Sequence, residues 1–272
     1  MTVFFTGHRG FLGRELIPEL ELHEDLVFFD GDLTDYDAVK NFIQDKSVTR
    51  IIHAASRGGR RNKVDTHETL LNNVRATTNV LRFDLPTILF CSGAIYNREE
   101  SVDNAQESNS LLSFPVDYYG QSKFISNSLA KNTGNSNILR FFNVFGPSEG
   151  LDRFISFNVS QYIKHKPMKI FKDFEMDFFY VQDTLPVLTS WLNESLFPNE
   201  INMVYRSKIR LSDVCELINS LSDHTVPIHI LEEPHNKNYT GSGQILESLN
   251  FTQVGLQVGI EHMYKSLRSN KL

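Results

Sequence analysis

The stretch Val3-Phe4-Phe5-Thr6-Gly7-His8-Arg9-Gly10-Phe11-Leu12-Gly13 decides the fold. A strand-like run enters three glycines spaced three residues apart, and the apolar spacing of residues 11–20 then indicates an amphipathic helix. The first glycine permits a tight turn, the second lets a pyrophosphate approach the helix N-terminus, and the third allows close helix packing. A plain strand-to-helix turn fits the same pattern. Asp30 favours dinucleotide binding, because it ends the next predicted strand, where a carboxylate can bond a ribose hydroxyl.

Strand-like and helix-like segments alternate through the N-terminal half of the chain. The predicted strands are residues 3–6, 26–29, 50–54, 87–92 and 137–144, and the predicted helices are residues 11–20, 36–44, 66–83 and 119–131. This alternation predicts an α/β fold with a doubly wound parallel sheet of the Rossmann type, covered by helices on both faces. We therefore expect residues 1–148 to form a dinucleotide-binding domain.

The pattern loosens after Gly146-Pro147. Residues 149–272 are expected to form mainly a smaller substrate-binding lobe, with a strand near 201–205 as a candidate to return to the sheet. Further helices are predicted at residues 154–165, 184–192, 212–221 and 258–267, with a short strand at 169–171. The cleft between the two parts is the expected substrate site.

Composition excludes several classes of protein. The 272 residues carry 27 Lys plus Arg against 33 Asp plus Glu, a net charge of −6, which lacks the basic footprint of nucleic-acid binding. The apolar runs are far shorter than the ~20 residues that cross a bilayer, and the N-terminus does not resemble a secretory signal. Cys91 and Cys215 lie in apolar surroundings, and no His or Cys spacing indicates a metal site. We expect a cytoplasmic protein that binds no metal, membrane or nucleic acid.

Three polar residues are candidates for proton transfer. Tyr119 and Lys123 stand four residues apart and share a helix face, and a cation beside a phenol favours its phenolate form. The pair is therefore a candidate proton donor, although such spacing is also common on exposed helix surfaces. Ser92 ends a predicted strand at the sheet edge where ligands bind. A simple strand-ending hydroxyl is its alternative interpretation.

Together these motifs resemble the extended short-chain dehydrogenase/reductase superfamily of nucleotide-sugar epimerases, dehydratases and reductases. The resemblance covers most of the chain and rests on the order and spacing of residues 6–13, 32–35, 53–55, 73–74, 92–96, 119–123, 139–147 and 177–183. The motif Gly7-His8-Arg9-Gly10 and the pair Gly58-Gly59 are most similar to the GDP-fucose synthase branch of this superfamily, and the 4-keto sugar reductases are similar as well.

The resemblance implies a cofactor, a catalytic trio and a homodimer. Tyr119 would move the proton at the sugar oxygen, Lys123 would bind the nicotinamide ribose, and Ser92 would hold the reacting oxygen. Asn143 matches a substrate-contacting asparagine, with a purely structural amide as its alternative. NAD or NADP would be bound by Gly7, Arg9, Gly10, Phe11, Leu12, Gly13, Asp30, Asp32, Leu33, Ala54, Ala55, Asn73 and Lys123.

The chain departs from the family pattern in the way it would bind anions. Residues 26–35 are too few for two strands, so Asp30 and Asp32 must serve the adenosine end from nearly one place. Arg9 suits a 2′-phosphate that Asp30 would repel, which leaves NAD versus NADP open. Met176 stands where the family has an arginine for the substrate diphosphate. Either another cation binds that diphosphate, or the substrate is not a conventional nucleotide sugar.

The basic run Arg57-Gly58-Gly59-Arg60-Arg61-Asn62-Lys63 is one candidate replacement for that arginine, and a solvated loop is its alternative. Arg60 of this run is accordingly a predicted substrate contact, and Arg153, outside the run, is a second predicted substrate contact.

The residues after Ser92 select among the family's reactions. Gly93 and Ala94 cannot carry a proton, whereas family dehydratases have an Asp-Glu pair there. GDP-fucose synthases have a cysteine at the position of Ala94 and a histidine near Arg153, and both are absent. The sequence therefore predicts an NAD(P)-dependent reductase of a 4-keto sugar, carried on a nucleotide. The alternatives are a nucleotide-sugar 4-epimerase with retained NAD and a non-catalytic dinucleotide-binding sensor.

Overall fold

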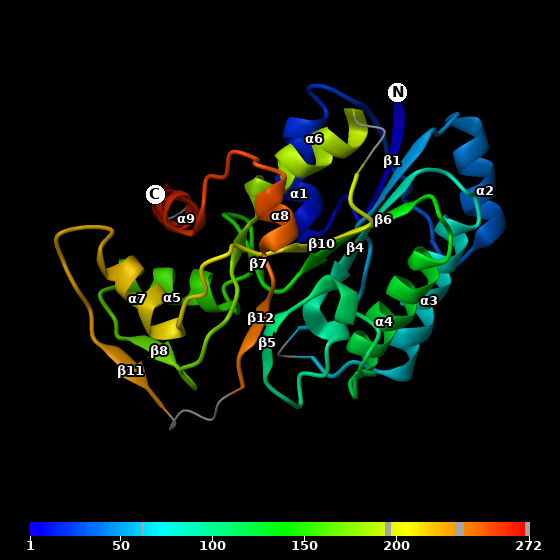
Figure 1. Ribbon diagram of the computed structural model, residues 1–272. Helices are drawn as coiled ribbons and strands as arrows, with labels where there is room; N and C mark the ends of the chain where they lie inside the picture. The colour runs from blue at the N-terminus through cyan, green and yellow to red at the C-terminus, as the bar shows by residue number, and fades with distance from the viewer. Residues whose placement is uncertain (61–62, 194–196, 232–236, 270–272) are drawn as a thin grey trace.

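A six-stranded parallel sheet forms the centre of the computed structural model, which describes residues 1–60, 63–193, 197–231 and 237–269. The strand order is β10-β6-β4-β3-β1-β2, and every neighbouring pair is parallel. The strands are β1 (Thr2–Thr6), β2 (Asp25–Val27), β3 (Arg50–His53), β4 (Thr87–Ser92), β6 (Ser136–Phe141) and β10 (Glu200–Met203) (Figure 1). The predicted doubly wound parallel sheet is confirmed.

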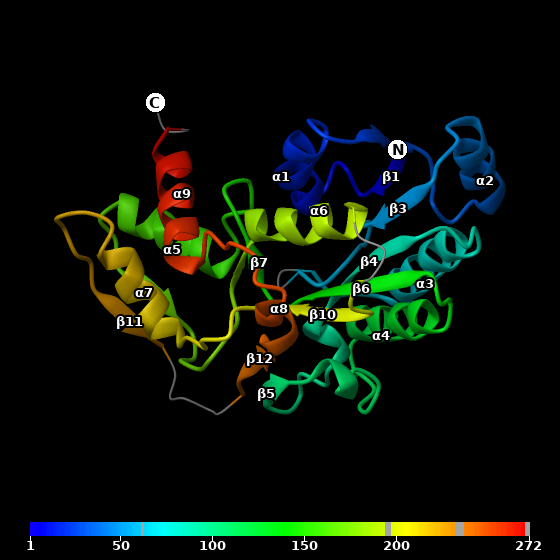
Figure 2. The same cartoon turned by 45° about the horizontal axis from the view of Figure 1, so that its top comes forward.

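Alternate residues of each strand enter different cores, as the pleat requires. Val3 and Phe5 of β1 pack under α1 (Phe11–Leu20) and α6 (Leu185–Asn193), which cover one face. Phe4 faces the other way, into the core beneath α2 (Tyr36–Asp45) and α3 (His67–Leu81). Helix α4 (Tyr118–Lys131) lies beside α3 on that second face (Figure 2). Strands buried on both faces explain the continuous apolar runs in the sequence.

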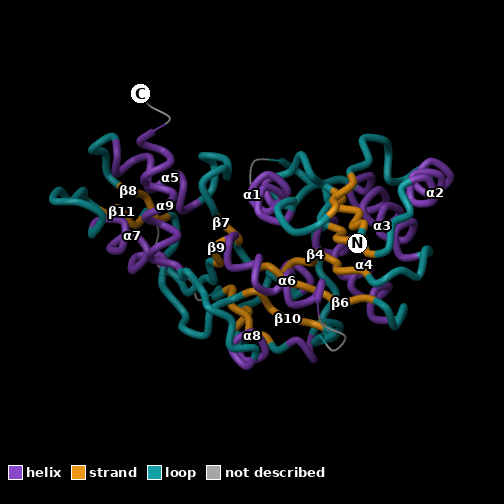
Figure 3. The backbone as a smooth tube through the Cα atoms, turned by 90° about the horizontal axis from the view of Figure 1, so that it is seen from above, coloured by secondary structure: helices purple, strands orange, loops and turns teal. Residues whose placement is uncertain are grey.

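Three helices gather in a lobe beside the sheet, namely α5 (Phe154–Ile163), α7 (Leu211–Asn219) and α9 (Leu256–Ser269) (Figure 3). A parallel pair, β8 (Met168–Ile170) and β11 (Ile228–Ile230), belongs to this lobe. The short pairs β5 (Val102–Ala105) with β12 (Tyr239–Gly241), and β7 (Val144–Phe145) with β9 (Phe179–Tyr180), connect the two parts. Helix α8 (Gln244–Ser248) follows β12. Among the described residues, no helix is both long and apolar enough to span a membrane.

Two features of the structure differ from the predicted elements. The predicted strand 137–144 breaks at Phe142 and Asn143 into β6 and β7, and the break turns Asn143 toward the lobe. Strands β5, β11 and β12 and helix α8 were not predicted, because elements of three to five residues are too short to produce a clear periodicity. Strand β10 pairs with β6, so residues from the C-terminal half complete the sheet.

Candidate active site

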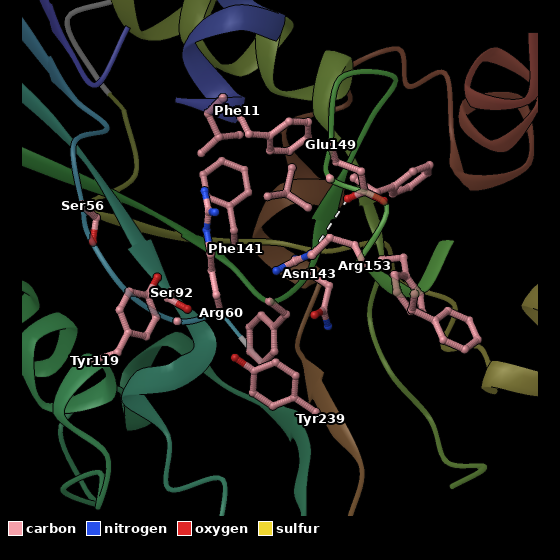
Figure 4. A pocket seen from close by; sticks show the side chains of 18 of the residues that line it. Phe11, Ser56, Arg60, Ser92, Tyr119, Phe141, Asn143, Glu149, Arg153 and Tyr239 are labelled. Carbon is pink, nitrogen blue, oxygen red and sulfur yellow. Dashed lines mark ion pairs between the residues drawn. The ribbon is translucent and has the colours of Figure 1, made fainter. Parts of the chain in front are cut away.

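A cavity of about 1010 Å³ opens between the carboxyl ends of the strands and the lobe. Residues 9–12, after β1, line it together with Ser92 at the end of β4 and Asn143 after β6. Arg153 and Tyr239 reach it from the lobe side (Figure 4). The sheet edge predicted for ligand binding is therefore the floor of this cavity.

The glycine turn after β1 leaves no room for a side chain at Gly7 or at Gly13. Gly7 has φ +79°, and a Cβ there would lie 2.8 Å from the Ala55 amide nitrogen. A Cβ on Gly13 would lie 2.4 Å from the His8 carbonyl oxygen, so α1 packs directly on the turn. Gly10 is the N-cap of α1 and lines the cavity, so the positive end of the helix faces open space. This cradle fits a dinucleotide pyrophosphate.

The expected adenosine end contains a compact charged cluster. Asp30 forms an ion pair with Arg9, whose Nη2 lies 2.7 Å from Asp30 Oδ1, and the same oxygen accepts a hydrogen bond from His8 Nε2 at 3.1 Å. Asp32 instead accepts the Thr34 amide hydrogen at 2.9 Å, a bond that holds the pKa of Asp32 below its usual value. Leu33 packs against the core beneath α2. Neither Asp32 nor Leu33 lines the cavity, and their role toward a cofactor stays a prediction.

The loop after β3 lies against helix α4. Asn73 brackets Arg57 by donating to its carbonyl oxygen and accepting from its amide, both at 2.9 Å. A Cβ on Gly59 would lie 2.8 Å from the Tyr119 ring, so the loop backbone contacts that ring directly. Ala54 and Arg60 line the cavity, whereas Arg61 and Asn62 lie outside the described residues. Asn73 therefore holds the backbone of this loop in place through both hydrogen bonds.

The structure brings the three predicted catalytic residues together in the cavity wall. Ser92 ends β4, while Tyr119 and Lys123 lie one turn apart on α4. The buried Lys123 donates from Nζ to the Phe90 carbonyl oxygen at 3.0 Å, and its Nζ lies 5.8 Å from the centroid of the Tyr119 ring. Burial and the charge of Lys123 lower the pKa of nearby His53 to about 3. That imidazole therefore stays neutral, and Lys123 is the cation of this group.

Tyr239 is a site residue that the sequence did not indicate. It comes from β12, 116 residues beyond Lys123 in the chain, and its phenol lies within hydrogen-bonding reach of the Ser92 hydroxyl. A Cβ on Gly93 would lie 2.7 Å from the Tyr239 hydroxyl oxygen, so this phenol needs a glycine after Ser92. Burial raises the pKa of Tyr239, which keeps the phenol protonated as a donor.

The opposite wall of the cavity contains a buried carboxyl group. Glu149 accepts the Ser156 amide hydrogen in the first turn of α5 and lies 3.9 Å from Arg153 Nε. Burial raises the pKa of Glu149 to about 7. Asn143 lines the same part of the cavity and donates to the Asp177 carbonyl oxygen at 3.0 Å, so it has a structural bond as well as cavity access.

Positive charge dominates the cavity although the chain is acidic. Met176 lines it between Phe174 and Phe178, where it offers no charge. The cationic lining residues are Arg9, Arg14, Arg60, Arg98, Lys123, Arg153, Lys172 and Lys237, against the acidic Glu100, Glu149 and Asp152. An anionic ligand is favoured in such a cavity.

Comparisons with known proteins agree with this geometry. The model of the NAD dependent epimerase/dehydratase family matches residues 3–202. An uncharacterized UDP-glucose epimerase of Bacillus subtilis is 24% identical, with 87% of this chain and 88% of that protein covered. The GDP-L-fucose synthetase of Naegleria fowleri bound to NADP superposes with a TM-score of 0.81 at 19% identity, over 99% of this chain and 93% of that one. A GDP-mannoheptose C4 reductase of Campylobacter jejuni with NADP bound has a TM-score of 0.81 at 15% identity, with 98% of each chain covered.

Proposed function

The chain belongs to the NAD-dependent epimerase/dehydratase family, and from that membership we propose that it is an NAD(P)-dependent reductase of a 4-keto sugar carried on a nucleoside diphosphate. The observation that carries the proposal is the convergence of Ser92, Tyr119 and Lys123 on a cavity beside the glycine cradle. Members of this family are enzymes, so we do not retain the alternative of a non-catalytic dinucleotide-binding sensor.

The residues of the chain divide the reaction between them. The glycine cradle at Gly7 and Gly10 would hold the cofactor pyrophosphate, and the bound nicotinamide supplies the hydride. Tyr119 donates a proton to the carbonyl oxygen as the carbon beneath it is reduced. Ser92 donates a hydrogen bond to the same oxygen. Lys123 places a positive charge beside Tyr119, which favours the phenolate that remains after proton transfer.

The surroundings of Ser92 support reduction without ring epimerisation. Gly93 and Ala94 are buried and absent from the cavity lining, so neither position offers an acid or a base to the sugar. Arg153 lines the far wall but is a permanent cation that cannot accept a proton. The cationic lining supports a substrate that carries phosphates, with Arg60 as the proposed contact.

A test in D₂O separates reduction from epimerisation. A 4-keto-6-deoxy nucleoside diphosphate hexose is incubated with the protein and NADH or NADPH, and the product is analysed by mass spectrometry and NMR. We expect oxidation of the cofactor and no enzyme-dependent deuterium at C3 or C5. Deuterium at either carbon would contradict the proposal. Turnover of a 4-hydroxy nucleotide sugar without added reduced cofactor would identify a 4-epimerase instead.

We also propose that the protein forms a homodimer through α3 and α4. Several apolar side chains before and at the start of α4 are exposed, namely Leu111, Leu112, Phe114, Val116 and Tyr118. Exposed apolar groups clustered beside a helix pair are typical of a protein interface. Sedimentation equilibrium of the wild type and of Phe114→Glu measures the oligomeric state of each protein directly.

A further inference from the structure

Arg98 connects the loop after Ser92 to the helix that carries Tyr119. Its Nη2 donates to Asp117 Oδ2 at 2.8 Å. Asp117 is the N-cap of α4, and its Oδ1 accepts the Gly120 amide hydrogen at 2.8 Å. One carboxylate therefore ties Arg98 to the first turn of α4, two residues before Tyr119. Neither Arg98 nor Asp117 belongs to the motifs that identified the catalytic trio.

The same two segments are also in direct backbone contact. A Cβ on Gly120 would lie 2.7 Å from the Ala94 carbonyl oxygen, so the first turn of α4 rests on the turn that follows Ser92. This contact joins the segment that carries Ser92 to the helix that carries Tyr119. The ion pair between Arg98 and Asp117 joins the two segments a second time, which restrains the start of the helix from sliding.

Arg98 also brings charge to the catalytic group. Its guanidinium interacts electrostatically with the phenols of Tyr119 and Tyr239 as well as with Asp117. The side chain is 41% exposed and lines the cavity, as Glu100 and Lys237 also do. A guanidinium has five N–H donors, and the bond to Asp117 uses one of them. The charge of Arg98 therefore acts on both phenols, more strongly on Tyr239 than on Tyr119.

We propose that Arg98 is a positioning residue for Tyr119, holding the start of α4 through Asp117 and presenting a second positive charge, besides Lys123, to the catalytic phenol. The proposal rests on the function proposed above for its reaction, but the tether can be tested without any substrate. Arg98 then links the two catalytic segments, Ser92 and α4, that reach the cavity from different parts of the chain.

The experiment compares three variants with a matched control. Arg98→Met removes the charge and the hydrogen bonds at similar length, and Asp117→Asn keeps a cap for Gly120 while removing the ion pair. Arg98→Lys keeps the charge without the planar fork. Arg82→Met is the control, because Arg82 stacks on the Tyr36 ring outside the cavity lining. The measurements are kcat and KM with the 4-keto substrate across pH, the Kd of NADH, and hydrogen exchange of residues 115–125.

We expect Arg98→Met to lower kcat about 10- to 100-fold, the range of a lost charged hydrogen bond, with KM and the NADH Kd within threefold. In the plot of kcat against pH, the limb that reflects ionisation of the catalytic phenol should move to higher pH in Arg98→Met. It should not do so in Asp117→Asn, because only Arg98→Met removes a cation. Arg98→Lys should retain the pH profile of the wild type. Exchange at the start of α4 should quicken in both Arg98→Met and Asp117→Asn, and Arg82→Met should change nothing.

A kcat of Arg98→Met within threefold of the wild type, or a lowered kcat with an unmoved pH profile, would overturn the charge role. Unchanged exchange at the start of α4 would overturn the tether. A wild type that reduces no 4-keto substrate would instead refute the proposed function, and exchange of the cofactor-bound protein would still decide the tether.

Discussion

Replacing Asp30 with asparagine should shift the cofactor preference from NADH toward NADPH. Asp30 lies 2.7 Å from Arg9 Nη2, and both side chains are mostly exposed, at 66% and 76%. Such a pair contributes only about 0–1 kcal/mol, so Arg9 is released easily. The obstacle to a 2′-phosphate is the negative charge of Asp30 itself. In Asp30→Asn the freed Arg9 can form a charged hydrogen bond of about 1.5–3 kcal/mol, which is about 10- to 100-fold in affinity.

Fluorescence titration of the wild type and the variant with each reduced cofactor measures this shift. We expect the wild type to bind NADH more tightly and Asp30→Asn to bind NADPH about 10- to 100-fold more tightly than the wild type does. Asp37→Asn is the matched control, because it removes the same charge from an exposed position in the first turn of α2. An NADPH Kd within twofold of the wild-type value, or a wild type that already prefers NADPH, would refute the reasoning.

Three further predictions address the reaction, the substrate and the fold. Tyr119→Phe should lower the rate of hydride transfer about 10²–10⁴-fold in single turnover and leave cofactor affinity within a few-fold; a residual rate above about a tenth would remove Tyr119 from the mechanism. Arg60→Ala should weaken substrate binding by about 1.5–3 kcal/mol, and an unchanged KM would exclude a phosphate contact. Burial raises the pKa of Glu149 to about 7, so its contribution to stability is present below the unfolded value near 4.5 and is lost as pH rises through 7. Between pH 5 and pH 8 the unfolding free energy of the wild type should therefore fall by ~2 kcal/mol more than that of Glu149→Gln, as measured by urea titration. Equal falls in the two proteins would contradict a raised pKa for the buried Glu149 carboxyl group.

Local patterns explain which parts of the site the sequence could predict. The glycine turn lies between one strand and one helix, and Tyr119 and Lys123 share one helix face, so both motifs are visible within a few residues. Tyr239 reaches Ser92 only because β12 pairs with β5, a contact that no local spacing encodes. Arg98 lies in a loop, and only the fold brings Asp117, 19 residues further along the chain, beside it.

The same argument applies to the fold. The helices and long strands have clear periodicities, and the central sheet followed from their alternation. The break of the predicted strand 137–144 had no such signal, because Phe142 and Asn143 change direction where the lobe meets the sheet. The end of β6 is therefore decided by packing between segments that lie far apart in the chain, such as Asn143 and Asp177.

The pairing of β10 with β6 determines how this chain can be shortened. A fragment that ended near residue 148 would contain the glycine turn, Ser92 and Tyr119, but β6 would become a bare outer strand. Ile138 and Leu139 of β6, now at most 1% exposed, would meet water together with a row of unpaired backbone groups. Unprotected outer strands of this kind pair with other molecules and aggregate. A minimal cofactor-binding fragment must therefore carry the segment from α6 through β10, joined to β6 by a linker in place of the lobe.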